Sequence, residues 1–310
     1  MSKPKILVIA LKTLEDFFSL KTTVFYLIAM LIVPVLFSLI LRSQNAMNFS
    51  NMTLEMQAII LTNLFLVFSF LWISGLPLVL FSIIKCSGFI SGEDNKGTLL
   101  ILVSKPVKRS EIILGKFLAF LLYIAIMQAA ILLVVPYIWT LINGLDLYVF
   151  GKLLGAVIPV YLYSLFVAII FGSIATALSS ISRNTVRTVI VLVFVTILIF
   201  FGCALIRNNI GQVYGNYGLY NFDINYHLGN AFNYFTGDLK MAPTMQVVLG
   251  TFSGTYRLSG SLVDPDQAIM PPSLPEYNYF SSTYSIVLWL AIAIGLMLFG
   301  IAFFEKRPIY

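Results

Sequence analysis

Residues 89–116 read FISGEDNKGTLLILVSKPVKRSEIILGK, the longest polar and charge-rich segment in the first half of the chain. It lies between two long apolar runs, residues 58–84 and residues 112–142. Runs of this length cross a bilayer, because about 20 residues of α-helix span a hydrocarbon core of about 30 Å. The segment is therefore predicted to connect two membrane spans on the water side, where another protein can reach it.

The composition places the chain in the all-α class of polytopic membrane proteins. Of its 310 residues, 59% are hydrophobic and only 10% are charged, whereas soluble domains carry roughly a quarter charged residues. The mean hydropathy is +0.95. The net charge of +6 does not indicate a nucleic-acid partner, because Lys and Arg gather in the cytoplasmic loops of membrane proteins. No basic face interleaved with aromatic residues occurs outside the apolar runs.

Six apolar runs are long enough to be transmembrane helices. They cover residues 24–41, 58–84, 112–142, 153–178, 188–206 and 284–304. An amphipathic helix is predicted before the first span, because Leu7, Leu11, Leu14 and Phe18 share one face and the charged residues lie opposite. Such a helix lies in the membrane interface. A helix packed on other protein is the alternative.

The distribution of basic residues predicts the orientation of the spans. Of the 19 Lys and Arg residues, all but five fall on one side, the exceptions being Arg42, Lys152, Arg207, Lys240 and Arg257. Cytoplasmic loops carry the excess of positive charge. Both termini are therefore expected in the cytoplasm, and the chain in the plasma membrane as a multi-pass protein.

The spans divide the chain into four parts: the interfacial helix 1–23, spans one to five in 24–206 with the cytoplasmic loop 85–111, an extracytoplasmic region 207–283, and the last span with its tail 284–310. The region 207–283 is rich in Tyr, Asn and Gly. It is interpreted either as a cap or docking surface for an extracytoplasmic protein, or as an interfacial loop without a partner.

Two glycosylation triplets and two cysteines are interpreted from the predicted topology. Asn48 and Asn51 each begin an Asn-x-Ser/Thr triplet, the acceptor for glycosylation. Cys86 and Cys203 lie at opposite sides of the membrane in the predicted topology, so no disulfide is expected between them.

The sequence carries none of the usual sites for chemistry or for nucleotide binding. Gly115-Lys116 is followed by Phe117, so it is not a Walker A motif, and no HExxH motif occurs. His227 is interpreted as a plain loop residue. No Asp or Glu lies deep in a span, where coupling carboxylates of ion-driven transporters are found. No catalytic, metal-binding or cofactor-binding residue is predicted, and the chain is not expected to be an enzyme.

Two polar residues inside spans, Asn63 and Gln128, remain. They are expected to make helix–helix hydrogen bonds rather than to line a path. A membrane part of this kind has no energy source of its own. Something else must drive it if it transports.

The loop itself contains a short apolar helix flanked by charge. Gly97 lets the chain turn, residues 99–103 are all apolar, and Pro106 ends the helix. Ser110 is predicted to cap the helix that enters the third span. A short apolar helix on a water-side loop needs a protein groove to bury it, or else it lies on lipid.

This stretch resembles the cytoplasmic loop of ABC-2 type permeases through the pattern Glu93-x-x-x-Gly97-Thr98-Leu99-x-x-Leu102-x-Ser104-x-Pro106-Val107-x-Arg109-x-Glu111-Ile112-x-Leu114-Gly115-Lys116. More narrowly, it is similar to the six-span permeases grouped with the nitrous-oxide-reductase maturation type. The interfacial first helix, the six spans and the second cytoplasmic loop, residues 178–184, agree with that outline.

The resemblance implies that residues 90–103 form a coupling helix on a separate ATPase subunit, which holds the ATP and Mg. It implies a complex of two permease chains with two ATPase chains. The residues that it assigns to the ATPase contact are Glu93 as the polar contact, Gly97 and Thr98 in the turn, Leu99 and Leu102 in the groove, and Arg109 on the partner or on lipid headgroups. Arg183 and Arg187 form a possible second contact.

Two functions from different classes follow. The first is an ABC permease, in which the ATPase moves the second and fifth spans and an apolar or amphipathic substrate is exported. The alternative is a non-transporting membrane scaffold that anchors an extracytoplasmic partner through residues 207–283. A polytopic membrane enzyme is disfavoured by the missing site residues.

Overall fold

The computed structural model describes residues 5–43, 49–99, 104, 107–210, 212–256 and 274–307. The described residues are 84% helical, and the β-pairing among them is an isolated bridge between Tyr256 and Glu276. Six helical segments are long and apolar enough to cross a membrane: Leu20–Ser43, Leu54–Cys86, Arg109–Asn143, Leu147–Ile181, Thr185–Arg207 and Ser282–Lys306. The predicted all-α, six-span fold is confirmed.

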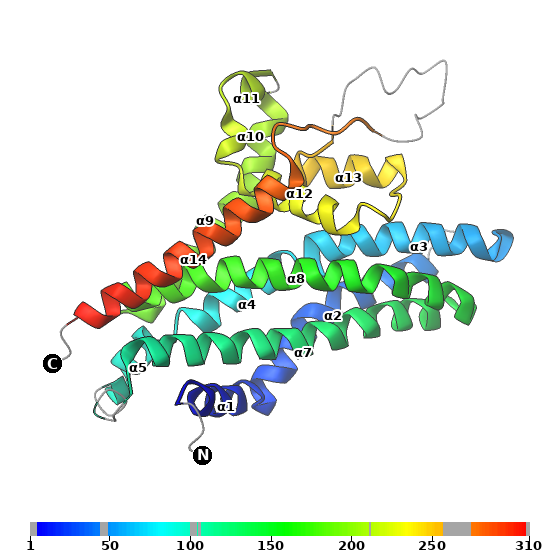
Figure 1. Ribbon diagram of the computed structural model, residues 1–310. Helices are drawn as coiled ribbons and strands as arrows, with labels where there is room; N and C mark the ends of the chain where they lie inside the picture. The colour runs from blue at the N-terminus through cyan, green and yellow to red at the C-terminus, as the bar shows by residue number, and fades with distance from the viewer. Residues whose placement is uncertain are drawn as a thin grey trace.

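The helices form a single bundle (Figure 1) and are named in chain order. They are α1 (Lys5–Phe17), α2 (Leu20–Ser43), η1 (Phe49–Asn51), α3 (Leu54–Phe68), η2 (Ser69–Ile73), α4 (Leu76–Cys86), α5 (Ser91–Asn95), α7 (Arg109–Asn143), α8 (Leu147–Ile181), α9 (Thr185–Ile197), η3 (Leu198–Gly202), α10 (Cys203–Ile210), α11 (Gln212–Asn216), η4 (Leu219–Asn221), α12 (Ile224–Thr236), α13 (Pro243–Ser253) and α14 (Ser282–Lys306).

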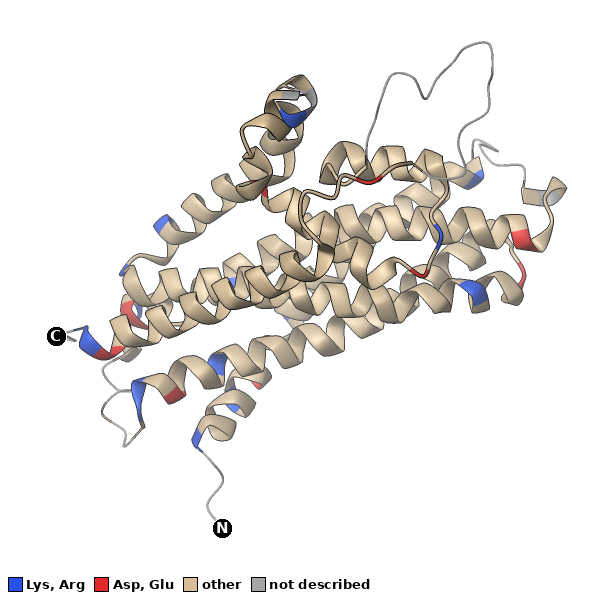
Figure 2. Ribbon diagram, turned by 45° about the horizontal axis from the view of Figure 1, so that its top comes forward, with Lys and Arg blue, Asp and Glu red and all other residues tan. Residues whose placement is uncertain are grey.

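Helix α8 is the centre of the bundle. It packs against α3, α4, α7 and α14, and α12 also rests on it. Lys, Arg, Asp and Glu residues gather toward the two ends of the long helices, and the middle of these helices is almost free of them (Figure 2). The end that carries α5 and the C-terminus is called the α5 end below. The predicted residues Asn48, Leu102 and Arg257 lie outside the described residues.

The second span is not the single helix that its apolar run predicts. It breaks after α3 into the π-helical turn η2, and a turn at Ser74 and Gly75 precedes α4. A side chain at Gly75 would lie 2.3 Å from the carbonyl oxygen of Leu71, so only glycine fits this turn. Gln128 of α7 donates to the Ile73 carbonyl oxygen at 2.9 Å. The predicted helix–helix hydrogen bond of Gln128 is thus present, and it meets the break.

The fifth span carries a second π-helical turn, η3, between α9 and α10. Its carbonyl groups are met from α12, where Asn225 donates to the oxygen of Ile199 at 2.8 Å. Inside a bilayer such groups have no water to bind, so a neighbouring side chain must satisfy them. Both breaks therefore persist because one amide side chain from another helix lies against each.

Helix α1 combines the two arrangements that its sequence leaves open. One face packs on α7, so closely that a side chain at Gly115 would lie 2.9 Å from Ile9. Of the predicted apolar stripe, Leu7, Leu11 and Phe18 are exposed in the structure. Exposed apolar residues beside a membrane span fit a helix that rests on its own chain and turns its other side to lipid.

The region 207–283 is largely helical where it is described, and it lies along the bundle rather than only at its end (Figure 1). The ring of Phe232 in α12 lies 5.3 Å from Phe70 in η2 and 5.0 Å from Tyr163 in α8. Asn63 of α3 accepts a hydrogen bond from the Ala242 backbone at 2.6 Å. These contacts fix α12 and the start of α13 against the middle of the second and fourth spans.

The interpretation of His227 as a plain loop residue is wrong. It lies in α12 and is 1% exposed. Its Nδ1 atom is 3.0 Å from the hydroxyl of Ser285, near the start of α14. The apolar and aromatic neighbours along α12 carry the ring into the interior. Tyr226 is fully buried there too, so part of the Tyr-rich composition serves internal packing.

A buried ion pair ties the same region together. Arg207 of α10 pairs with Asp223, whose carboxylate also accepts a hydrogen bond from the Tyr214 hydroxyl at 2.8 Å. A second nitrogen of Arg207 donates to the Phe252 carbonyl oxygen at 2.6 Å. Asp223 further caps α12 by accepting from the Tyr226 backbone at 3.2 Å. One pair thus joins α10, α11, α12 and α13. Cys86 and Cys203 are both free, as predicted.

We expect Asp223→Ala to destabilise the folded chain by about 3–5 kcal/mol, because it leaves a buried guanidinium without its counter-charge. Thermal unfolding of the detergent-solubilised protein measures the loss. Asp238→Ala is the matched control, since Asp238 is exposed and has no ion pair within the described residues. Equal effects of the two substitutions would contradict the structural role of the pair.

The environment of His227 predicts a dependence on pH. Burial lowers the pKa of this histidine, although Asp223 and the Asn221 carbonyl act in the opposite direction. The unfolded chain, with a histidine pKa of about 6.5, therefore binds more protons below that pH, and stability falls as pH drops through about 6.5. Because the chain has a single histidine, His227→Gln should reduce this loss in melting experiments at pH values from about 7.5 to 5.5.

Candidate functional site

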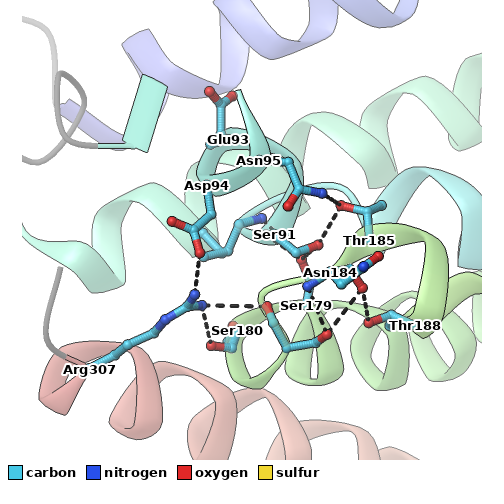
Figure 3. Close-up of polar contacts among 12 residues, drawn as sticks. Ser91, Glu93, Asp94, Asn95, Ser179, Ser180, Asn184, Thr185, Thr188 and Arg307 are labelled. Carbon is cyan, nitrogen blue, oxygen red and sulfur yellow. Dashed lines mark hydrogen bonds and ion pairs between the residues drawn. The ribbon is translucent and has the colours of Figure 1, made fainter. Parts of the chain in front are cut away.

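The loop that the sequence singles out begins with α5, a helix of five residues that leaves α4 at a tight turn (Figure 3). Helix α5 ends at Asn95, and two residues later Gly97 adopts a φ of 70°, a left-handed conformation that favours glycine. The predicted turn at Gly97 is therefore present. Thr98 and Leu99 follow it, and most of the predicted apolar helix beyond Leu99 lies outside the described residues.

Hydroxyl groups fix α5 to the α5 ends of α8 and α9. The hydroxyl of Ser179 accepts hydrogen bonds from the backbone N–H groups of Ile90 at 3.0 Å and of Ser91 at 3.2 Å. The hydroxyl of Ser91 lies 2.8 Å from that of Thr185, the first residue of α9. Asn95 donates to the same Thr185 oxygen at 3.3 Å. The start of α5 is thus held by both sides of the α8–α9 turn.

Glu93 joins α5 to the third span. Its carboxylate pairs with Lys116 of α7 at 2.8 Å and accepts a hydrogen bond from the Thr98 hydroxyl. Lys116 also donates to the Phe89 carbonyl oxygen at 2.8 Å, and its side chain is only 10% exposed. Burial opposes ionisation of Glu93, but the bonds from Lys116 and Thr98 outweigh it, so the pKa of Glu93 lies below its ordinary value.

Asp94 joins α5 to the last span. It pairs with Arg307, directly after α14, and the two side chains point toward one another while Glu93 points away from them (Figure 3). Arg307 also donates to the Ser180 carbonyl oxygen at 3.2 Å. Arg109, at the start of α7, donates to the Phe304 carbonyl oxygen at 2.7 Å and to that of Arg307 at 2.6 Å. The ends of α7, α8 and α14 therefore meet at one cluster.

Several predicted contact residues are thus engaged within the chain. Glu93, Thr98 and Arg109 all bind groups of their own protein, and Leu99 is 1% exposed. Their assignment to an ATPase contact stays a prediction. The exposed residues at the end of α5 and around the α8–α9 turn include Asn95, Lys96, Gly97, Arg183, Asn184 and Arg187.

One local prediction is wrong. Helix α7 begins at Arg109, and the preceding residue, Lys108, is its N-cap. The Glu111 carboxylate accepts the Lys108 backbone N–H at 2.9 Å. Ser110 is therefore already helical and does not cap. Glu111, three residues after the N-cap, indicates the start of this helix better than Ser110 does.

Sequence reasoning missed Asp94, Lys116, Ser179 and Arg307 as members of the cluster. Lys116 stands in the loop pattern without an assigned role, Arg307 serves as an orientation charge, and a single serine in a polar turn carries no distinguishing signal. Among the residues that the structure covers, no three His, Cys, Asp or Glu side chains gather as metal ligands would. The cluster offers fixed ion pairs rather than a reactive group.

The α5 segment lies within the part of the chain that matches a known protein family. A model of the family described as ABC-2 family transporter protein matches residues 73–308. The chain belongs to this family of ABC-2 transporters. The match begins in η2 and includes α5, both of its ion pairs and Arg307. No curated protein matched the chain.

Membership confirms the broader part of the predicted resemblance. The ABC-2 chain is a membrane transporter permease and a multi-pass membrane protein. Members of the family generally pair with an ABC ATPase. The family points to a transmembrane subunit without catalytic activity of its own.

We expect Lys116→Met to destabilise the ABC-2 chain by about 1–3 kcal/mol, because a half-buried Glu93 carboxylate loses its charged donor. The double substitution Glu93→Gln with Lys116→Met should recover part of this loss, since no uncompensated charge remains. Thermal unfolding of Lys116→Met, Glu93→Gln and the double variant gives the coupling energy. Lys306→Met, an exposed lysine of α14, should change little. An additive double mutant would rule out the pairing.

Proposed function

We propose that this chain is the membrane-spanning permease subunit of an ABC exporter, driven by a separate ATPase that docks at α5. The observation that carries the proposal is the connectivity of α5. Its five residues are bonded to α7 through Glu93, to α8 and α9 through Ser91, and to the end of α14 through Asp94. A force on this helix therefore reaches four spans at once.

The exposed residues at the end of α5 and in the α8–α9 turn provide the docking surface. Asn95, Lys96, Arg183 and Arg187 are exposed there. ATP and Mg are held by the ATPase, and two copies of each chain form the transporter. The excess of Lys and Arg at this side supports a cytoplasmic location for the surface and both termini. The loop pattern favours the nitrous-oxide-reductase maturation group.

Two spans are built to change shape. The second and fifth spans, which the coupling model moves, are the two that contain π-helical turns, η2 and η3. Such turns occur frequently at functional sites because they interrupt the regular hydrogen bonds of the helix. Rotation of α4 or α9 relative to the outer half of its span can take place at these turns without melting a full helix.

The lining of the spans supports an apolar or amphipathic substrate. Each Asp or Glu within the six spans lies in the first or last turn of its helix, as Glu55, Glu111 and Glu305 do. A path through them offers no buried carboxylate to an ion or to a strongly charged solute.

The alternative is a membrane scaffold for an extracytoplasmic protein. It is supported by largely exposed aromatic residues in the region 207–283, since Tyr217 is 78% and Phe222 is 84% exposed. A scaffold would retain an outer partner and would not alter ATP turnover by any ABC ATPase.

The proposal is tested by placing bulk on the docking surface. Charge reversal at Glu93 would disturb the loop itself, because Lys116 faces that carboxylate. Asn95→Trp disturbs the loop less, since Asn95 is exposed at the end of α5 and gives up only a long hydrogen bond of 3.3 Å to the Thr185 hydroxyl. We expect it to weaken binding of the partner ABC ATPase by at least about tenfold, the loss that about 1.4 kcal/mol of docking energy produces, and so to lower both its co-purification and ATP turnover in proteoliposomes.

Asn209→Trp is the matched control, an exposed asparagine on α10 at the far side of the bundle. It should leave both readouts unchanged while the chain elutes as a folded species. Wild-type permease that neither binds an ABC ATPase nor changes its turnover would exclude the exporter and favour the scaffold.

A further inference from the structure

A second feature of the α5 end is a cavity of about 610 Å³ between α1, α4, α5 and α7. Its walls include Phe17 of α1, Ile84 of α4 and Phe89 before α5. Helix α1, which packs on α7 beside Gly115, forms one wall of the cavity. The cavity therefore exists only because the first helix returns to the protein.

The charges around this cavity do not balance. Four lysines line it, together with two carboxylates, and these residues are Lys12, Asp16, Lys85, Glu93, Lys96 and Lys116. Lys116 is already paired with Glu93. Within the described residues no ion pair engages Lys12, Lys85, Lys96 or Asp16. Three cations against one free carboxylate favour an anion in the cavity.

Lys85 shows how the protein holds such a cation without a counter-charge. Its ammonium donates to the Thr22 hydroxyl at 3.0 Å. It also lies 5.8 Å from the ring centre of Phe17 and 5.7 Å from that of Phe81. A hydroxyl and two aromatic faces position the charge but do not neutralise it, so its attraction for an anion is kept.

The cavity lies near the α5 ends of the second and third spans, where the lipid headgroups are expected to begin. Lys116 lies seven residues into α7, about 10 Å along the helix. Ile84, which lines the cavity from the last turn of the second span, is 45% exposed. An anion with an apolar tail fits both surfaces, whereas a free phosphate or a nucleotide would leave the exposed isoleucine unused.

We propose that this cavity binds the phosphate of an anionic membrane lipid whose acyl chains run along Ile84. Basic pockets between transmembrane helices on the cytoplasmic side are known to take such headgroups. The bound phosphate bridges Lys12 on α1 and Lys96 beside α5, and so joins the interfacial helix to the loop. Binding needs only residues of this one chain and does not depend on the proposed docking of an ATPase.

The test is native mass spectrometry of the purified full chain with equal amounts of phosphatidylglycerol and phosphatidylethanolamine of identical acyl chains. The wild type should retain phosphatidylglycerol in preference. Lys12→Gln with Lys96→Gln should lower that retention by at least about fivefold, since a lysine near a lipid surface contributes roughly 1 kcal/mol. Asp16→Asn, which removes the free carboxylate, should raise it, and this gain does not depend on a damaged fold.

The control removes the same charge elsewhere at this end: Lys21→Gln with Lys306→Gln, two exposed lysines that do not line the cavity. It should retain phosphatidylglycerol as the wild type does. Equal retention of both lipids by the wild type, or an equal loss in the control, would overturn the proposal. Unchanged lipid retention in Lys12→Gln with Lys96→Gln, combined with loss of a co-purifying ATPase, would assign the cavity to the protein partner instead and also overturn it.

Discussion

A helix that breaks inside a bilayer exposes backbone groups that no water can bind, and much of this fold answers to that constraint. The breaks at η2 and η3 survive because Gln128 and Asn225 donate to their carbonyl oxygens. These two amides come from different places, one from the third span and one from α12. The region between the fifth and sixth spans is therefore needed for the membrane part, since without α12 the turn η3 would lose its donor.

The same logic explains the α5 end. A five-residue helix cannot bury enough surface to hold its own position, so its place must come from specific polar contacts. Ser179 satisfies two backbone N–H groups at its start, and each of the two acidic side chains reaches a different span. Because the pairs lie at a membrane boundary and are largely shielded from water, they hold more firmly than fully exposed pairs would. The proposed coupling requires rigidity of this kind, since a flexible loop would not pass movement on to the bundle.

The sequence predicts the spans well because length and hydropathy depend on the bilayer alone. It also identifies the turn at Gly97, since the preference of glycine for a left-handed conformation depends on the residue itself and not on distant partners. The partners of Glu93 and Asp94 could not be predicted, because Lys116 and Arg307 are distant in sequence and serve equally well as orientation charges. The break of the second span was missed for a different reason. Its apolar run is continuous, and only Gly75 followed by Pro77 hints at it.

Helix α12 contacts both interrupted spans, through Phe232 and through Asn225. The Phe232 ring touches Phe70 inside η2 and Tyr163 in the middle of α8, and Asn225 seven residues earlier holds η3. Helix α12 is thus in contact with both interrupted spans at the point where each can bend. A change in η2 that starts from α4 and α5 cannot leave Phe232 in place, because interiors packed at this density transmit small shifts rather than absorb them. The buried pair of Arg207 and Asp223 then carries that shift to α10 and α13 as one unit.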